Sequence, residues 1–304
     1  MMYDLIEATP KVNKTKVFIA SIIVIIIVLI IVGAVIIHYN KKNNNIAKIK
    51  EENNIIENIE NIENINKTAN PQNKKMHQIS VNMIPIYNET TNEKMKKIYS
   101  NNEEKTVYLT FDDGPSKTVT PLILDLLKQE NIKATFFVLG SRAELNPELI
   151  KREYNEGHYI ANHGYSHVYS RIYESKESVF EEYIKTRDIV GNILQNGYDG
   201  HLFRFPGGST GGKYKNLKAD AKNFLIENGV SSIDWNALSQ DAAGAKTKEA
   251  LIQNVIESVG SKNTAVILMH DAGDKILTYE SLIDVINYLR EQGYVFKNFY
   301  NIMK

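Results

Sequence analysis

Strand-like and helix-like segments alternate between residues 105 and 304, and this alternation limits the possible folds more than any other feature. The strand-like segments are rich in β-branched and aromatic residues and are Thr106–Phe111, Ala134–Leu139, His158–Ala161, His201–Phe205, Ser231–Asp234, Ala265–Met269 and Val295–Phe299. Helical patterns lie between them, among them Thr120–Glu130, Glu174–Leu194, Lys246–Ser258 and Tyr279–Arg290. This alternation predicts an α/β fold with a parallel sheet and right-handed crossovers. Seven strand units in this length favour a closed (β/α) barrel over an open sheet.

A run of 21 residues, Val17–Ile37, contains only two residues outside the apolar set, Ser21 and Gly33. A helix needs about 20 apolar residues to span a bilayer, so the run predicts an uncleaved transmembrane anchor. A cleaved signal peptide is the alternative, but its apolar region has only about 7–15 residues. Lysines flank both ends of the run and do not fix its orientation, because long domains translocate largely regardless of flanking charge.

Between this run and the alternating region, residues 38–104 are mostly polar. Residues 43–66 consist mainly of Asn, Ile, Glu and Lys, and isoleucines recur at every third position from Ile56 to Ile65. A coiled coil needs alternating steps of three and four residues, so we interpret this segment as a stalk with weak support for self-association. The segment 67–104 contains two prolines and resembles a linker.

The composition excludes several classes of function. The chain has 36 basic and 36 acidic side chains and a pI of about 7.1, whereas a nucleic-acid-binding protein needs a basic surface. We therefore expect no nucleic-acid partner. The absence of cysteine excludes disulfides, thiolate metal sites and a cysteine nucleophile. Any metal must be bound by histidine, aspartate or glutamate.

Two groups of chemically competent residues follow predicted strands, where parallel barrels build their active sites. Asp112 and Asp113 come directly after the first strand, and the Gly-Pro pair behind them predicts a turn. Two adjacent carboxylates cannot point the same way from an extended chain, so one can bind a metal while the other faces a substrate as a base. His163 and His167 are four residues apart, which predicts one face of a helical turn and a metal-chelating pair. Alone, the aspartates are typical of an acidic turn, and a histidine is usually structural.

Three further segments carry functional side chains but are not specific by themselves. Arg204 precedes a Phe-Pro-Gly-Gly sequence, which predicts a rigid turn with exposed backbone N–H groups around Gly207. Trp235 and Asp241 lie in a polar loop. His270 ends an apolar strand and is consistent with either a core histidine or a general acid with a carboxylate partner.

Taken in order, the five segments resemble the polysaccharide deacetylase family, which is carbohydrate esterase family 4 or the NodB-homology domain. The most diagnostic strings are Thr-Phe-Asp-Asp-Gly-Pro at 110–115 and Ala-Thr-Phe-Phe at 134–137. The resemblance covers residues 105–304 and implies a distorted, incomplete (β/α) barrel. It also implies one divalent metal, most often Zn²⁺ and sometimes Co²⁺ or Ni²⁺. The implied metal ligands are Asp113, His163 and His167.

The resemblance further implies an acid–base pair. Asp112 is expected to be the catalytic base and Arg204 the residue that positions it. His270 is expected to be the catalytic acid and Asp241 the carboxylate that tunes it. A nearby cation favours an ionised carboxylate, and a nearby carboxylate favours an imidazolium, so Arg204 should keep Asp112 ionised and Asp241 should keep His270 protonated.

Substrate contacts are also implied. The Gly207 N–H should hold the oxyanion, Leu268 should line the acetate pocket, and Trp235 should lie either in the sugar wall or in the core. Three positions depart from the family pattern. Gly164 replaces Ser or Thr and is expected to loosen the histidine loop. Gly207, in Arg-Phe-Pro-Gly-Gly, and Ala242 remove bulk near the sugar, so the subsite preference is open.

We therefore expect a metal-dependent deacetylase of N-acetylglucosamine in peptidoglycan, most similar to membrane-anchored members of Gram-positive bacteria. The single anchor and polar stalk favour this substrate indirectly, with residues 1–16 in the cytoplasm and residues 38–304 facing the cell wall. The catalytic domain is expected at residues 105–304. Alternatives are deacetylation of poly-N-acetylglucosamine, chitin oligomers or acetyl-xylan. A non-catalytic glycan-binding membrane tether and a scaffold acting through the stalk also remain open.

Overall fold

The computed structural model describes residues 89–100, 104–195, 198 and 200–303, which belong to one compact unit, Met76–Lys304. The strands of this part of the chain form one sheet in which every pairing is parallel. They are β1 (Thr106–Asp112), β2 (Thr135–Val138), β3 (Tyr159–Asn162), β4 (Leu202–Phe203), β5 (Ser231–Ser232), β6 (Ala237–Leu238), β7 (Thr264–His270) and β8 (Val295–Lys297). The predicted α/β class and parallel sheet are confirmed.

The sheet order is β5-β4-β3-β2-β1-β7-β6, with β8 paired to β1. β5 and β6 end this path and are not paired with each other in the described part of the chain, so the barrel is incomplete. The closed barrel that the strand count favoured is therefore wrong, and the incomplete barrel implied by the family resemblance is correct. β1 pairs along its whole length with β7, while β8 pairs with its first residues and β2 with its last. β1 is fully buried and β7 is buried up to His270. Strands covered on both faces read as continuous apolar runs, which explains why both were predictable.

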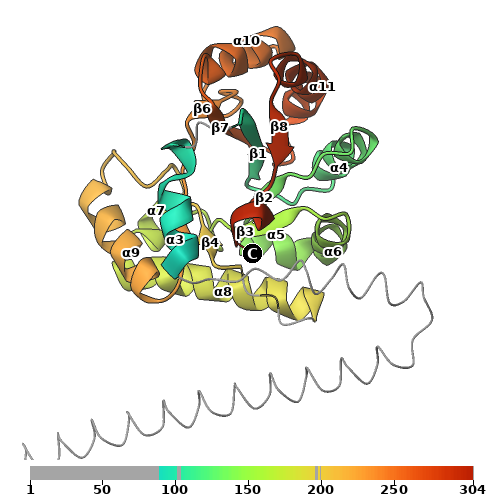
Figure 1. Ribbon diagram of the computed structural model, residues 1–304. Coiled ribbons are helices and arrows are strands. Elements are labelled where there is room, and N and C mark those ends of the chain that lie inside the picture. The colour runs from blue at the N-terminus through green and yellow to red at the C-terminus, as the bar shows by residue number, and fades with distance from the viewer. Residues whose placement is uncertain (1–88, 101–103, 196–197, 199, 304) are drawn as a thin grey trace, which may run out of the picture. The chain divides into compact units, whose positions relative to one another are not determined.

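Helices surround the sheet, as Figure 1 shows. Four of them begin and end within three residues of the predicted bounds: α4 (Thr120–Gln129), α8 (Lys176–Leu194), α10 (Lys248–Val259) and α11 (Ile276–Glu291). The others described are α5 (Gly140–Leu145), α6 (Pro147–Asn155), α7 (Tyr169–Ile172), α9 (Lys215–Glu227) and α12 (Tyr300–Met303). Each longer helix buries an apolar stripe, as α4 does with Ile123, Leu124 and Leu127.

The strand β6 was not predicted, and its pairing explains why. It has two residues, which pair with Ile267 and Leu268 of β7. The adjoining Asn236 side chain extends the ladder, because its Nδ2 donates to the Thr264 carbonyl and its Oδ1 accepts from the Val266 N–H, both at 2.8 Å. A side chain that replaces a backbone partner leaves no period-two pattern in the sequence.

The end of the segment that we interpreted as a linker is folded. It forms α3 (Glu89–Lys96) and a 3₁₀ turn, η1 (Ile98–Ser100). Met95 and Ile98 are buried in the main hydrophobic core, with exposed fractions of 3% and 5%. Two apolar residues among many polar ones gave too weak a pattern to reveal this contact.

Three sequence predictions lie outside the described residues. They are the transmembrane anchor at 17–37, the stalk with weak self-association at 43–66 and the polar beginning of the linker. Within the described ranges, no helix has both the length and the apolar character needed to cross a membrane.

Candidate active site

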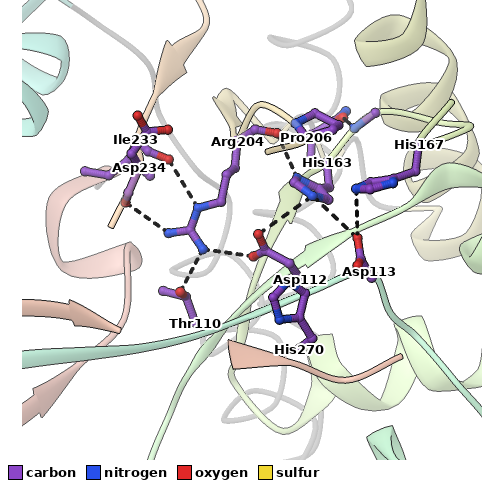
Figure 2. Close-up of polar contacts among 12 residues, drawn as sticks. Thr110, Asp112, Asp113, His163, His167, Arg204, Pro206, Ile233, Asp234 and His270 are labelled. Atoms are coloured by element: carbon purple, nitrogen blue, oxygen red, sulfur yellow. Dashed lines mark hydrogen bonds and ion pairs between the residues drawn. The ribbon is translucent and has the colours of Figure 1, made fainter. Parts of the chain in front are cut away.

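The three predicted metal ligands come together at the carboxyl ends of β1 and β3. Asp113 follows β1, while His163 and His167 lie in the loop after β3. Asp113 Oδ1 lies 3.5 Å from His163 Nε2 and 3.4 Å from His167 Nε2 (Figure 2). One ligand atom from each residue lies within 4.8 Å of the others, which makes them a possible metal-binding group.

The chemistry of this group fits a divalent metal. Tetrahedral zinc with bonds of about 2.0–2.1 Å holds its ligand atoms about 3.3–3.4 Å apart, close to the observed separations. Asp113 Oδ1 is buried and accepts no hydrogen bond from the described residues. The Nδ1 of His163 donates to the Arg204 carbonyl at 2.8 Å, so its Nε2 is the unprotonated nitrogen that faces Asp113. Burial also lowers the pKa of His163 to about 3, which keeps the ring neutral.

The segment that holds the two histidines is a loop, so the predicted helical turn is wrong. Gly164 and His167 adopt left-handed backbone angles, with φ of +81° and +56°. The carboxylate of Glu182 in α8 takes the place of helical hydrogen bonds. It accepts from the N–H groups of Tyr165 and Ser166 at 2.6 and 2.7 Å, and from Ser166 Oγ at 2.7 Å.

The left-handed backbone at residue 164 favours glycine, while the expectation that Gly164 loosens the histidine loop stays a prediction. A Cβ at this position would lie 3.0 Å from Ile172 Cδ1 and would face Glu182, and its positive φ disfavours other residues. The Gly164 N–H also donates to Asn162 Oδ1 at 2.9 Å. The family-typical Ser or Thr would disturb this backbone.

Asp112, the predicted base, is 2% exposed and is held by Arg204. Arg204 Nη1 donates to Asp112 Oδ1 at 2.8 Å and to Thr110 Oγ1 at 2.7 Å. The other guanidinium nitrogens donate to backbone carbonyls of the β5–β6 connection, as Figure 2 shows. Arg204 is itself fully buried, so its geometry is fixed on every side.

Burial raises the pKa of Asp112, and the charges of Arg204 and His270 oppose that rise. The expectation that Arg204 favours the ionised form is correct in direction, but burial outweighs it. A carboxylate with a raised pKa is a stronger base than an exposed one. The site thus offers a basic oxygen in a fixed position.

His270, the predicted acid, is paired with Asp241. Asp241 Oδ1 lies 2.8 Å from His270 Nδ1, and Asp241 Oδ2 accepts from the His270 backbone N–H at 2.7 Å. Thr278 Oγ1 donates to the same Oδ2 at 2.7 Å. Burial alone would lower the pKa of His270. The hydrogen bond and charge of Asp241, with the charges of Asp112 and Asp113, outweigh burial and raise the pKa to about 9.

The sheet register places base and acid side by side. Asp112 and His270 are the last residues of neighbouring parallel strands and are partners in the β1–β7 register. Both lie at the carboxyl ends of their strands, close to Asp113 (Figure 2). The structure therefore brings a buried carboxylate, an imidazole with a raised pKa and a group that could hold a metal to one place.

The predicted substrate contacts lie around this centre. Leu268 is two residues before His270, hence on the same face of β7, and is 8% exposed. The Gly207 N–H has no acceptor among the described residues, which leaves it available for an oxyanion. Trp235 is half-buried and packs against the hydrophobic core. It also lies 3.2 Å from the position that a Cβ would take at Gly208, so it contacts the loop that holds Gly207 and Gly208.

Two residues that the sequence did not single out complete the site. Glu182 holds the histidine loop, as described above. Tyr169 fills the space beside Gly207, where a Cβ would lie 2.4 Å from the tyrosine Oη. The side chain absent at Gly207 is thus replaced by a ring from α7. The centre of this ring lies 5.6 Å from that of His167, and the two rings are tilted by 56°. Ala242 is exposed.

The comparisons agree with the site. The family model described as polysaccharide deacetylase matches residues 99–224. A peptidoglycan-N-acetylglucosamine deacetylase of Bacillus cereus is 33% identical over 232 residues, which are 72% of this chain and 80% of that protein. A deacetylase with the same name from Listeria monocytogenes is 37% identical over 196 residues, 63% of this chain but only 37% of its own length.

A solved structure with a similar fold carries the same enzyme name as these relatives. It is the catalytic domain of a peptidoglycan N-acetylglucosamine deacetylase from Eubacterium rectale, which is 34% identical and superimposes with a TM-score of 0.60. The match covers 65% of this chain and 90% of that one. With its fold, its candidate site and its relatives in agreement, this chain belongs to the polysaccharide deacetylase family.

Proposed function

We propose that this chain is a metal-dependent hydrolase that removes the acetyl group from N-acetylglucosamine residues of peptidoglycan. The observation that carries the proposal is the register partnership of Asp112 and His270 beside the Asp113 carboxylate. Hydrolysis of an amide needs a base to activate water and an acid to protonate the leaving amine. The site supplies both from neighbouring strands.

Asp113, His163 and His167 would bind the metal, which we propose to be Zn²⁺, with Co²⁺ or Ni²⁺ as substitutes. A bound divalent metal supplies Lewis acidity and lowers the pKa of water. Three protein ligands leave room for water and for the acetamide oxygen. His163 is held in the required tautomer by its bond to the Arg204 carbonyl.

Asp112 acts as the base in this proposal. It accepts a proton from the attacking water while the water oxygen adds to the acetyl carbonyl carbon. Arg204 fixes the other carboxylate oxygen at 2.8 Å, so a single oxygen remains for the water. The charge that develops on the carbonyl oxygen is stabilised by the Gly207 N–H. Leu268 packs against the acetyl methyl group.

His270 acts as the acid. With a pKa of about 9 it is protonated at neutral pH and donates from Nε2, because Nδ1 is held by Asp241. The proton goes to the amide nitrogen as the C–N bond breaks, which releases acetate and leaves glucosamine in the glycan. Asp112 then releases to solvent the proton that it took from water, and His270 takes up one proton from solvent, so both groups return to their starting states.

The choice of peptidoglycan rests on the relatives, several of which carry that name. We also propose that residues 17–37 anchor the chain in the cell membrane, with residues 1–16 inside and the catalytic domain facing the wall. The support is the apolar run itself, which has the length of a bilayer-spanning helix.

The test is release of acetate from purified peptidoglycan by the purified full-length chain with added zinc. We expect acetate to form, glucosamine to appear in the digested wall, and both to vanish in Asp112→Asn. Acetate from soluble N-acetylglucosamine oligomers or acetyl-xylan but none from the wall would assign another polysaccharide. Glycan binding that survives Asp112→Asn without any acetate would indicate a non-catalytic tether.

A further inference from the structure

A cavity of about 370 Å³ lies beside the candidate metal site and has no role in the chemistry above. Its walls are the β1–α4 loop, the helix α5 and the β7–α11 loop, and Asp113 is one of its lining residues. The volume is in the range of cavities that hold small-molecule ligands. Because Asp113 belongs to both, a ligand in the cavity would adjoin the reacting centre.

Hydrogen bonds tie the three walls together, so the cavity is formed in advance. Asn146 Nδ2 donates to the carbonyls of Pro115 and Arg142, both at 3.0 Å, which joins α5 to the β1–α4 loop. Thr118 Oγ1 donates to the Gly273 carbonyl at 2.9 Å, which joins that loop to the β7–α11 loop. A preformed site loses less entropy when a ligand binds.

The cavity is cationic. Lys117 and Arg142 line it. Both are exposed to solvent, and neither side chain has an acidic partner or a hydrogen-bond acceptor among the residues that the structure describes. The one acidic lining residue is Asp113, whose Oδ1 faces the two histidines instead. Exposed cations on a protein surface are usually paired or solvated, but two unpaired cations in a preformed cavity favour an anionic ligand.

We propose that this cavity is a subsite for a carboxylate on the sugar next to the one that is deacetylated. The inference rests on the proposed function. In peptidoglycan, N-acetylglucosamine alternates with N-acetylmuramic acid, whose lactyl ether ends in a carboxylate or continues into a peptide stem. Chitin and poly-N-acetylglucosamine carry no such anion. An arginine binds a carboxylate through two parallel hydrogen bonds.

The rim of the cavity supports the same ligand. Leu145 is 66% exposed at the edge of the cavity and offers an apolar contact for the lactyl methyl group or a stem side chain. Lys117 would add a second charge without fixed geometry. The cavity therefore distinguishes an acidic glycan from a neutral one.

The experiment compares kcat/KM on three oligomers of equal length. The first is a stem-free peptidoglycan strand with free lactyl carboxylates, the second is the same strand with those groups converted to neutral amides, and the third is an N-acetylglucosamine oligomer. We expect the full-length zinc-loaded chain to prefer the first. In Arg142→Gln the ratio of kcat/KM between first and second should fall about tenfold, as for loss of a charged hydrogen bond. Lys128→Gln removes an exposed charge outside the cavity and should leave the ratio unchanged.

An equal fall on all three oligomers in Arg142→Gln, or no preference in the wild-type chain, would overturn the subsite. Calorimetric binding of the same oligomers separates this inference from the proposed function. If no oligomer releases acetate, the deacetylase proposal fails. A preference for the acidic strand in binding, lost in Arg142→Gln, would still support the subsite, and equal binding would refute it.

Discussion

Replacing Asp241 by asparagine should convert His270 from a protonated acid into a neutral imidazole at physiological pH. Asp241 makes two contacts to His270, one to the ring Nδ1 and one to the backbone N–H. Asparagine has nearly the same shape and keeps an oxygen that accepts from Nδ1. The substitution therefore removes mainly the negative charge.

The structure gives the size of the effect. Burial lowers the pKa of His270, and Asp241, with smaller contributions from the charges of Asp112 and Asp113, reverses that effect and raises the pKa from 6.5 to about 9. That change corresponds to about 3.4 kcal/mol, because one pKa unit is worth about 1.4 kcal/mol. Burial, the largest single effect, remains in the variant together with the weaker attraction of Asp112 and Asp113, so we expect a pKa at or below 6.5. At about pH 7.5 the protonated fraction then falls from about 97% to at most about 9%, and activity falls at least about tenfold.

The assay is the pH profile of kcat/KM for acetate release, which reports the pKa values of the free enzyme. The alkaline limb should lie near pH 9 in the wild-type chain and at or below 6.5 in the variant. The same shift should appear in the NMR titration of the His270 ring. Asp274→Asn removes an exposed charge from the neighbouring loop and should leave the limb in place. A uniformly lower rate with an unmoved limb would refute the reasoning, because Asp241 would then only orient the ring.

Three other predictions follow from the same contacts. The folded-state pKa of His270 lies above its unfolded value, so its contribution to the unfolding free energy is complete below about pH 6.5 and is lost as pH rises through about 9. Urea titrations should therefore show that the unfolding free energy decreases by about 3 kcal/mol across that range. A free energy that does not change with pH would contradict this prediction. Glu182→Gln should weaken zinc binding about 10–100-fold in calorimetry, because the neutral amide accepts weaker hydrogen bonds from the histidine loop. The circular dichroism spectrum should be unchanged. Zinc affinity equal to that of the wild-type chain would exclude a role of Glu182 in positioning the histidines. Arg204→Met should lower the unfolding free energy, measured in urea, by about 3–5 kcal/mol, because it leaves the Asp112 carboxylate buried without its charged partner. A loss below about 1 kcal/mol would show that the Asp112 carboxyl group is neutral in the folded protein.

The parts of the fold that the sequence predicted are those with a local signal. β1 and β7 are covered on both faces and read as apolar runs, and the longer helices carry apolar stripes. β6 has no such signal because its partners are a distant strand and the Asn236 side chain. The folded end of the linker shows the same limit, since Met95 and Ile98 are two apolar residues in a polar segment.

Some features of the candidate site were predictable from the sequence, and others were not. The proposed metal ligands and the proposed acid–base pair lie at or shortly after the carboxyl ends of β1, β3 and β7, so the sequence could place them together. The predicted helical turn at the two histidines was wrong because the backbone N–H groups of this loop donate hydrogen bonds to Glu182, which lies 16–17 residues later in the chain. Tyr169 was missed for a related reason: only the three-dimensional structure shows that its ring occupies the space beside Gly207.

The most direct test of the account is a zinc titration of acetate release. The full-length chain is stripped of metal, and acetate from peptidoglycan is measured as zinc is added stepwise, alongside His163→Ala. We predict no acetate without metal, a rise that saturates at about one zinc per chain, and no rise in the variant, because Asp113, His163 and His167 form a single site. Equal acetate release with and without metal, or a full response in His163→Ala, would contradict the account.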